Sequence, residues 1–223
     1  MRCAICNFLS AVVLRNGDVL THPLLDSHSD LVRYYQLPDG RQHHQHFAKV
    51  ELTPDDWLNV DTWNFRLDEE TAPGWWEDVK TQAEATLRDR AKAMIVTTGR
   101  KDLILEGCWI LAGDAEFADV RGGRIIHMYG GTLTGMYGGT LTAMRGGTLT
   151  EMRGGTLTAM RGGTLTGMYG GTLTEMYGGT LTPMPTPYYA LTLSDQAQAF
   201  LKVLEPKPRK AAKKTSRRKA RAQ

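Results

Sequence analysis

Two groups of residues near the start of the chain have the types and spacing of metal ligands. In the first group Cys3 and Cys6 are separated by two residues, and His43, His44 and His46 could complete a site, because zinc usually takes four nitrogen or sulfur ligands. One cysteine pair, without a second pair or a spaced histidine pair, is more often explained by ordinary surface or core residues. We therefore expect no metal and no cofactor, and Cys3, Cys6, His43 and His46 are the candidates if a metal is bound.

The second group contains His22, Asp26, His28 and Asp30. These side chains could also ligate a metal, but Asp26 and Ser29 serve equally well as turn and helix-cap residues. The local interpretation is sufficient, so this group adds no further reason to expect a metal.

Nucleophilic catalysis has little support from the sequence. Cys6 precedes a predicted hairpin, as in amino-terminal nucleophile amidotransferases, but such a thiol must follow the initiator Met directly and five residues precede it here. Paired carboxylates such as Asp55-Asp56 and Glu69-Glu70 fall in loops or at the ends of elements, where solvated charge is the ordinary explanation. We expect a protein without catalytic residues, and a metal-binding or hydrolytic head remains an alternative.

The last eighteen residues carry the clearest interaction signal. They hold nine of the 27 Lys and Arg residues and no Asp or Glu, so the rest of the chain is acidic. Such a tail predicts salt-sensitive binding to nucleic acid or another polyanion, and a solubilising tail is the alternative. It contains no aromatic residue that could stack on bases. The basic residues are Lys207, Arg209, Lys210, Lys213, Lys214, Arg217, Arg218, Lys219 and Arg221.

Residues 121–184 repeat an eight-residue unit, Tyr/Arg-Gly-Gly-Thr-Leu-Thr-X-Met. A divergent copy begins at Arg121, and seven regular copies follow. Two glycines and two threonines in every eight residues exclude a helix, and a strict period places equivalent residues in equivalent surroundings. The repeat therefore predicts a β-solenoid. The regular copies begin at Tyr129, Tyr137, Arg145, Arg153, Arg161, Tyr169 and Tyr177.

Eight residues are too few to close a coil, so we predict two units per coil and four coils. Thr-Leu-Thr is expected to be a three-residue strand with Leu inside and Thr outside, while Met fills the interior from the turns. One edge would then carry Tyr129, Arg145, Arg161 and Tyr177, and the other Arg121, Tyr137, Arg153 and Tyr169. Glu151 would lie near Arg153. The threonines predicted to form a surface are Thr132, Thr134, Thr140, Thr142, Thr148, Thr150, Thr156, Thr158, Thr164 and Thr166.

The units resemble the octapeptide of bacterial ice-nucleation proteins, whose consensus is Ala-Gly-Tyr-Gly-Ser-Thr-Leu-Thr. Residues 136–142, Met-Tyr-Gly-Gly-Thr-Leu-Thr, share the Tyr, the following Gly and Thr-Leu-Thr in register. The resemblance implies a flat β-solenoid with sixteen-residue coils and allows ice binding through Thr-X-Thr rows. It covers about a quarter of the chain. Arginine in the tyrosine place and the small number of repeats are departures from that family.

The start of the chain is similar to uncharacterised proteins of bacteria and their phages that also end in Gly-Gly-Thr repeats. The similarity is carried by residues 6–18, by Trp63-Asn-Phe-Arg-Leu-Asp-Glu-Glu70 and by Pro73-Gly-Trp-Trp76. It implies a phage or bacterial origin and no activity.

The remaining pattern predicts four parts: an α+β head over residues 1–103, the solenoid over 104–184, a cap with a short helix over 185–205, and a disordered basic tail over 206–223. In the head, Asn16-Gly17 predicts a hairpin and Ser29 could cap a short helix ending at Leu37. Strands are expected at 47–52 and 62–67, a long amphipathic helix from Pro73 to Ile95, and one strand at 103–111. Open solenoid ends could pair with other copies unless the head and cap cover them.

The composition fits a soluble protein. No apolar run reaches the length of a membrane helix, and residues 1–14 are better explained as a strand than as a signal peptide. Three cysteines, an odd number, favour reduced thiols and a cytoplasmic location. We expect a non-catalytic interaction protein with a Thr/Tyr/Arg solenoid surface and a cationic tail for nucleic acid, and ice binding is the alternative.

Overall fold

The computed structural model describes residues 9–182, except residues 39, 41 and 42, together with residues 192–193. Cys3, Cys6, the predicted helix of the cap and the basic tail lie outside the described residues. The described chain is an α+β head followed by a β-solenoid of about five turns, as predicted. Among these residues no helix is both long and apolar enough to span a bilayer.

The head is built on a four-stranded antiparallel sheet, the head sheet. Asn16-Gly17 forms the predicted hairpin turn, in which Gly17 adopts a positive φ of 90°. Side chains alternate between the two faces of β3, so Val50 and Leu52 face α2, whereas Phe47 faces α1. The strands, in sheet order, are β2 (Val19–Leu20), β1 (Leu9–Leu14), β3 (Phe47–Thr53) and β4 (Asn64–Leu67).

Helices cover both faces of the head sheet. The long helix α2 (Trp76–Met94) confirms the predicted amphipathic helix and buries Val79, Ala83 and Leu87. The short helix α1 (His28–Tyr34) is capped by Ser27, whose hydroxyl accepts a hydrogen bond from the Asp30 amide, so the prediction of Ser29 as the cap was wrong by two residues. Two 3₁₀ turns complete the head, η1 (His43–Gln45) and η2 (Val60–Thr62).

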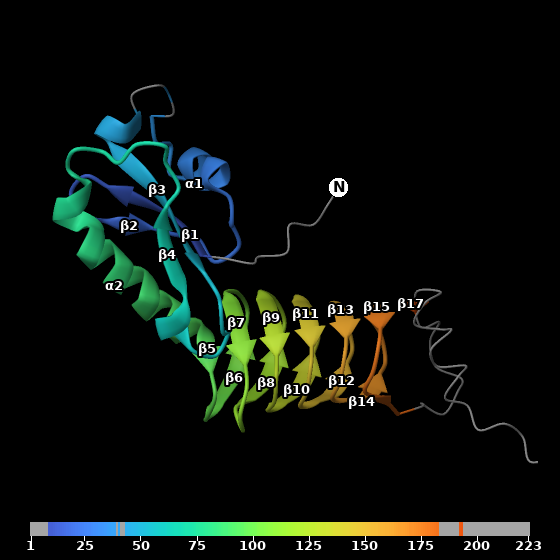
Figure 1. Cartoon of the computed structure of the whole chain (residues 1–223). Helices are drawn as coiled ribbons and strands as arrows, with labels where there is room; N and C mark the ends of the chain where they lie inside the picture. Colours follow the sequence, from blue (N-terminus) through green and yellow to red (C-terminus); the bar gives the residue numbers. More distant parts are fainter. Residues whose placement is uncertain (1–8, 39, 41–42, 183–191, 194–223) are drawn as a thin grey trace, which may run out of the picture.

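The solenoid consists of two parallel sheets whose strands alternate along the chain (Figure 1). The even sheet contains β6 (Arg100–Ile104), β8 (Glu116–Val120), β10 (Thr132–Met136), β12 (Thr148–Met152), β14 (Thr164–Met168) and β16 (Thr180–Leu181). The odd sheet contains β5 (Ile95–Val96), β7 (Cys108–Leu111), β9 (Arg124–Met128), β11 (Thr140–Met144), β13 (Thr156–Met160), β15 (Thr172–Met176) and β17 (Thr192–Leu193).

The register confirms sixteen residues per coil. Leu133 pairs with Leu149, and Leu149 pairs with Leu165, so identical side chains stack through the interior. The repeat strands β9 to β15 are each five residues long and end at Met, so the prediction of a three-residue strand with Met in the turn was wrong. Met136 is completely buried in the same core as Leu133. The residue between Thr and Met is not part of this core and lies on the outer side of the strand, so the alternation is broken and both Leu and Met point inward.

The stack also begins earlier than the repeats. Phe117 lies sixteen residues before Leu133 and pairs with it, and Glu116 pairs in the same way with Arg100. The predicted single strand at 103–111 is two strands in different sheets, separated by Gly107 at a φ of 97°. The solenoid therefore has more coils than the four predicted from the Gly-Gly-Thr units.

Two consecutive glycines close each corner because coils approach one another there. A Cβ atom on Gly146 would lie 2.3 Å from the carbonyl oxygen of Tyr129 in the preceding coil. Gly147 has a φ of 76°, and its Cβ would lie 2.6 Å from the carbonyl oxygen of Gly131. Both the backbone conformation and the space thus require glycine.

The head packs directly on the first coils. Helix α2 runs into β5 without a loop, and Ile110 and Tyr129 of the solenoid pack against the core of the head. Figure 1 shows the head above the β7 end of the odd sheet, with the later coils extending away from it. The exposed edge strand β6 carries Arg100, Lys101 and Asp102, which oppose edge-to-edge pairing. At the other end β17 extends the odd sheet beyond β15.

Candidate binding surface of the solenoid

The first residue of each repeat forms two rows along the sides of the stack, and each row mixes arginine with tyrosine. We call the row of Tyr129, Arg145, Arg161 and Tyr177 the first edge. We call the row of Arg121, Tyr137, Arg153 and Tyr169 the second edge. Both rows follow from the sixteen-residue register and match the predicted arrangement.

Each arginine stacks on a tyrosine one coil away. On the first edge the Arg145 guanidinium lies 5.7 Å from the centre of the Tyr129 ring, and that of Arg161 lies 5.1 Å from the Tyr177 ring. On the second edge Arg121 stacks on Tyr137 at 5.5 Å and Arg153 on Tyr169 at 5.1 Å. These distances are within the range of cation–π attraction, so the rings hold the guanidinium planes in place.

The two edges differ in their counter-charges. On the second edge Arg121 lies 3.3 Å from the Asp119 carboxylate, and Arg153 lies 2.8 Å from that of Glu151. The hydrogen bond that Arg153 donates to the Glu151 carboxylate raises the pKa of Arg153 above its ordinary value. The outward residue two places before each arginine thus neutralises it, as predicted for Glu151.

On the first edge the equivalent outward residues are Ala143 and Ala159. Within the described part of the chain neither Arg145 nor Arg161 forms an ion pair with a carboxylate. The nearest acidic residue of that row, Glu175, accepts a hydrogen bond of 2.8 Å from the Tyr177 hydroxyl. The first edge is therefore a pair of neighbouring, uncompensated arginines held between two tyrosines.

The positive field of the first edge reaches His127, which occupies the outward place of the divergent repeat. His127 is 7 % exposed, packs edge-on against Trp57 of the head at 4.4 Å, and has no hydrogen-bond partner for Nδ1 among the described residues. Burial first, and then the charges of Arg145 and Arg161, lower its pKa to about 4. His127 is therefore neutral at pH 7 and contributes no positive charge to the surface.

The predicted threonine rows are formed in register on both sheets. Thr132 pairs with Thr148 and then Thr164 on the even sheet, and Thr140 pairs with Thr156 on the odd sheet. Their side chains are half-buried to exposed and none lies in the core. Thr134, in the second row of the even sheet, donates a hydrogen bond of 3.1 Å to Glu116.

Cys3 and Cys6 lie outside the described residues, so the first predicted metal group stays a prediction, but its member His43 has other partners. His43 binds the Glu69 carboxylate at 3.0 Å through Nε2, while its Nδ1 contacts the Gly40 carbonyl. Asp30 is paired with Arg33 instead of a histidine. Of the second predicted group only His28 joins a cluster of possible ligands, and its partners in that cluster were not predicted.

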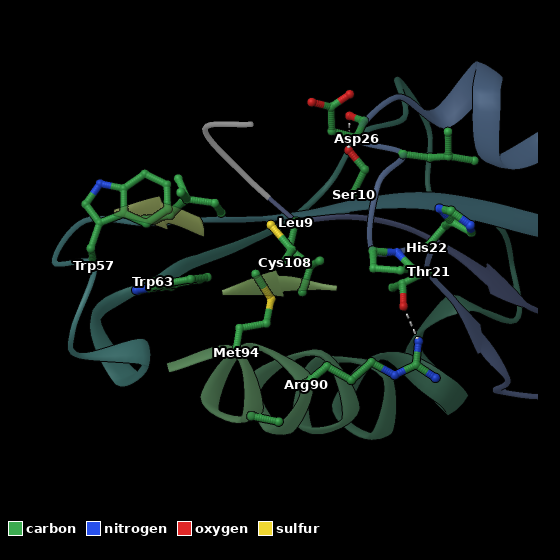
Figure 2. A pocket seen from close by; sticks show the side chains of 15 residues that line it. Leu9, Ser10, Thr21, His22, Asp26, Trp57, Trp63, Arg90, Met94 and Cys108 are labelled. Atoms are coloured by element: carbon green, nitrogen blue, oxygen red, sulfur yellow. Dashed lines mark hydrogen bonds between the residues drawn. The ribbon is translucent and has the colours of Figure 1, made fainter. Parts of the chain in front are cut away.

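A cavity of about 230 Å³ lies between the head and the odd sheet (Figure 2). Its wall is mostly apolar and includes Trp57, Met94 and Ile126. Arg90 of α2 donates a hydrogen bond of 2.6 Å to the Thr21 hydroxyl at its rim (Figure 2). Burial raises the pKa of the Cys108 thiol in its wall to about 11, so the thiol is protonated at neutral pH and is a poor nucleophile.

The fold and this surface define a β-solenoid repeat protein with an α+β head. No protein-family model, no curated protein and no solved structure matches the chain. The function must therefore be argued from the surface itself, and the difference between the two edges is its most specific feature.

Proposed function

We propose that this protein is a non-catalytic interaction protein whose solenoid binds nucleic acid through the first edge. The observation that carries the proposal is the pair Arg145 and Arg161, which have no carboxylate partner in the described chain, although the arginines of the second edge both do. An uncompensated cation pair on a rigid scaffold attracts an anionic partner.

The geometry of the first edge suits phosphate groups. Neighbouring strands lie about 4.7 to 4.9 Å apart, so Arg145 and Arg161 leave the backbone one rung of the stack apart. Each guanidinium can offer two parallel N–H donors to a phosphate, and stacking on Tyr129 or Tyr177 fixes its plane before binding. Less side-chain freedom is lost on binding as a result.

The basic tail adds charge to the same interaction. Its nine Lys and Arg residues, between Lys207 and Arg221, can neutralise phosphates. The tail would supply most of the attraction and its dependence on salt, whereas the first edge would supply a fixed orientation.

Salt titrations of binding to a fluorescent DNA duplex test the proposal. We expect the double variant Arg145→Gln, Arg161→Gln to bind more weakly and to reduce the magnitude of the slope of log K against log salt concentration by about two. Each lost phosphate contact reduces that slope by about 0.9. A chain ending at Glu205 should lose a larger part of the slope. The matched control, Arg121→Gln with Arg153→Gln, should bind like the wild type. Equal binding by both pairs of variants would remove the role of the first edge.

A second candidate function, ice binding, is favoured by the threonine rows. Rows such as Thr140, Thr156 and Thr172 on the odd sheet repeat at the strand spacing, as an array that orders water would require. Thermal hysteresis and droplet freezing test this function, with Thr140→Tyr and Thr142→Tyr as the disrupting variant. If the wild type freezes water no differently from buffer, this candidate is eliminated.

A further inference from the structure

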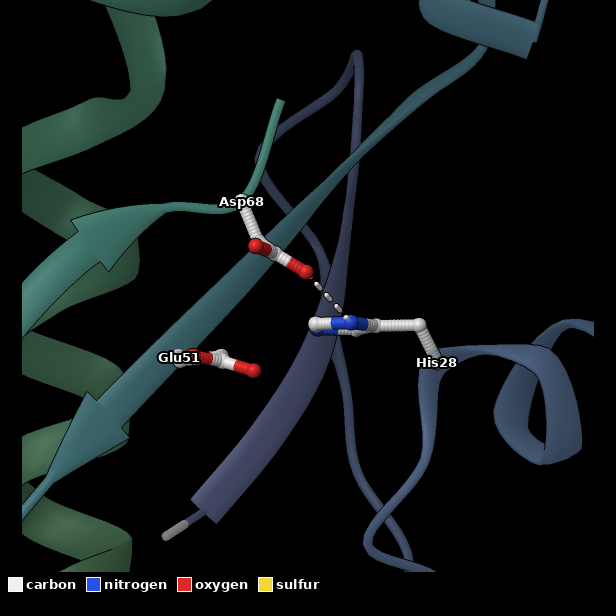
Figure 3. A group of neighbouring side chains, drawn as sticks. All are labelled: His28, Glu51 and Asp68. Carbon is white, nitrogen blue, oxygen red and sulfur yellow. Dashed lines mark ion pairs between the residues drawn. The ribbon is translucent and has the colours of Figure 1, made fainter. Parts of the chain in front are cut away.

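We propose that His28, Glu51 and Asp68 form a divalent metal site on the α1 face of the head sheet, with zinc as the preferred ion. The three residues are distant in the sequence, yet one possible ligand atom from each lies within 4.8 Å of the others. Figure 3 shows the two carboxyl groups approaching the imidazole ring of His28 from neighbouring strands. This site is independent of the proposed binding edge.

Three elements bring the ligands together. His28 is the first residue of α1, Glu51 lies on β3, and Asp68 directly follows β4. Pairing of β3 with β4 places Glu51 opposite Arg66, and the Asp68 amide donates a hydrogen bond of 2.8 Å to the Lys49 carbonyl. The backbone of two paired strands thus fixes both carboxylates.

The hydrogen bonding of His28 leaves one nitrogen for a cation. Its Nε2 lies 2.9 Å from the Val50 carbonyl oxygen, which can only accept, so Nε2 carries the proton. The other nitrogen, Nδ1, lies 3.2 Å from Oδ2 of Asp68, and a neutral imidazole would direct a lone pair at a carboxylate there. In that tautomer a metal ion bound at Nδ1 would lie between the ring and the Asp68 carboxylate. Metal-bound histidines usually donate their second N–H in this way, to a carbonyl or carboxylate.

The separation of His28 and Asp68 fits zinc coordination. Ligand atoms about 2.0 to 2.1 Å from a tetrahedral ion are about 3.3 Å apart, close to the 3.2 Å between Nδ1 of His28 and Oδ2 of Asp68. Glu51 is buried and Arg66 binds its Oε2 through two nitrogens, which orients the carboxylate and leaves Oε1 for the ion. Asp68 is about half exposed, so water can occupy the remaining position.

The donor set also distinguishes between metals. One imidazole and two carboxylates suit zinc and related transition ions, whereas magnesium prefers oxygen ligands in a regular octahedron. We therefore expect zinc to bind with a stoichiometry of one and excess magnesium not to displace it.

Zinc titration by calorimetry tests the site in the full chain carrying Cys3→Ser and Cys6→Ser, which removes the competing thiols. We expect one equivalent to bind, and Asp68→Asn to weaken binding at least tenfold. Glu69→Gln is the matched control, because the adjacent Glu69 also contacts a histidine, His43, but belongs to no cluster of three ligands among the described residues. This control should leave zinc affinity unchanged.

A second measurement separates ligation from an effect on folding. In ¹⁵N spectra of the histidine rings, zinc should shift Nδ1 of His28 and leave both nitrogens of His43 in place. Zinc binding that is lost with the cysteines and unaffected by Asp68→Asn would overturn the proposal. Absence of zinc binding in the cysteine variant would overturn it as well.

Discussion

Protonation of His127 should destabilise the junction between head and solenoid in acid. The pKa of His127 is lowered from 6.5 to about 4 in the folded chain, because the ring is buried against Trp57 and lies near two arginines. A depressed folded pKa means that the unfolded chain binds the proton more tightly. The contribution of neutral His127 to the free energy of unfolding is therefore fully present above pH 6.5 and is lost as the pH falls toward 4.

The magnitude follows from the size of the shift. A free-energy difference of about 1.4 kcal/mol per pKa unit gives an upper value of about 3 kcal/mol between pH 7 and pH 4. Because the ring retains some contact with solvent, we expect about 2 to 3 kcal/mol of unfolding free energy to be lost through this residue.

Urea denaturation at a series of pH values measures this loss. His127→Phe keeps a ring against Trp57 but cannot be protonated, so the wild type and the variant differ only through this group and all other titrations cancel. The stability difference between the two proteins should change by about 2 to 3 kcal/mol from pH 7 to pH 4. A difference that is independent of pH would refute the reasoning.

Two further predictions concern the stack, and both are measured by chemical denaturation. Leu157→Ala should cost about 3 to 4 kcal/mol, because Leu157 is completely buried between coils, whereas Leu181→Ala in the last described coil should cost about 1 to 2 kcal/mol. Similar losses would contradict a continuous core. Gly163→Ala should cost more than Gly99→Ala by about 1 to 3 kcal/mol, although both have a φ near 78°. Only at Gly163 would the new Cβ meet backbone, 2.7 Å from the Gly147 carbonyl oxygen, and equal costs would show that corner packing is unimportant.

The repeat allowed most of the solenoid to be predicted from the sequence. A period of eight residues with one Leu required a sixteen-residue coil, and this spacing alone placed Arg145 beside Tyr129. The first coils were missed because they lack Gly-Gly-Thr. Their signal is spacing alone, since Phe117 precedes Leu133 by sixteen residues.

The features that depend on distant contacts could not be predicted. Glu51 and Asp68 become neighbours of His28 only through antiparallel strand pairing and the packing of α1, and no local pattern marks either residue. The burial of His127 depends on Trp57, which is seventy residues earlier in the chain. The charge difference between the edges was visible in part, since Glu151 was expected to offset Arg153.

The central claim is that an arginine of the solenoid binds nucleic acid only where no carboxylate neutralises it. Exchanging the outward residues tests this claim without removing any arginine: Ala159→Glu should neutralise Arg161, and Glu151→Ala should release Arg153. Both substitutions introduce residues found at the same place in other repeats. In salt titrations on a DNA duplex, the first should lower the slope by about one and the second should raise it by about one. Slopes that remain equal to that of the wild type in both variants would contradict the account.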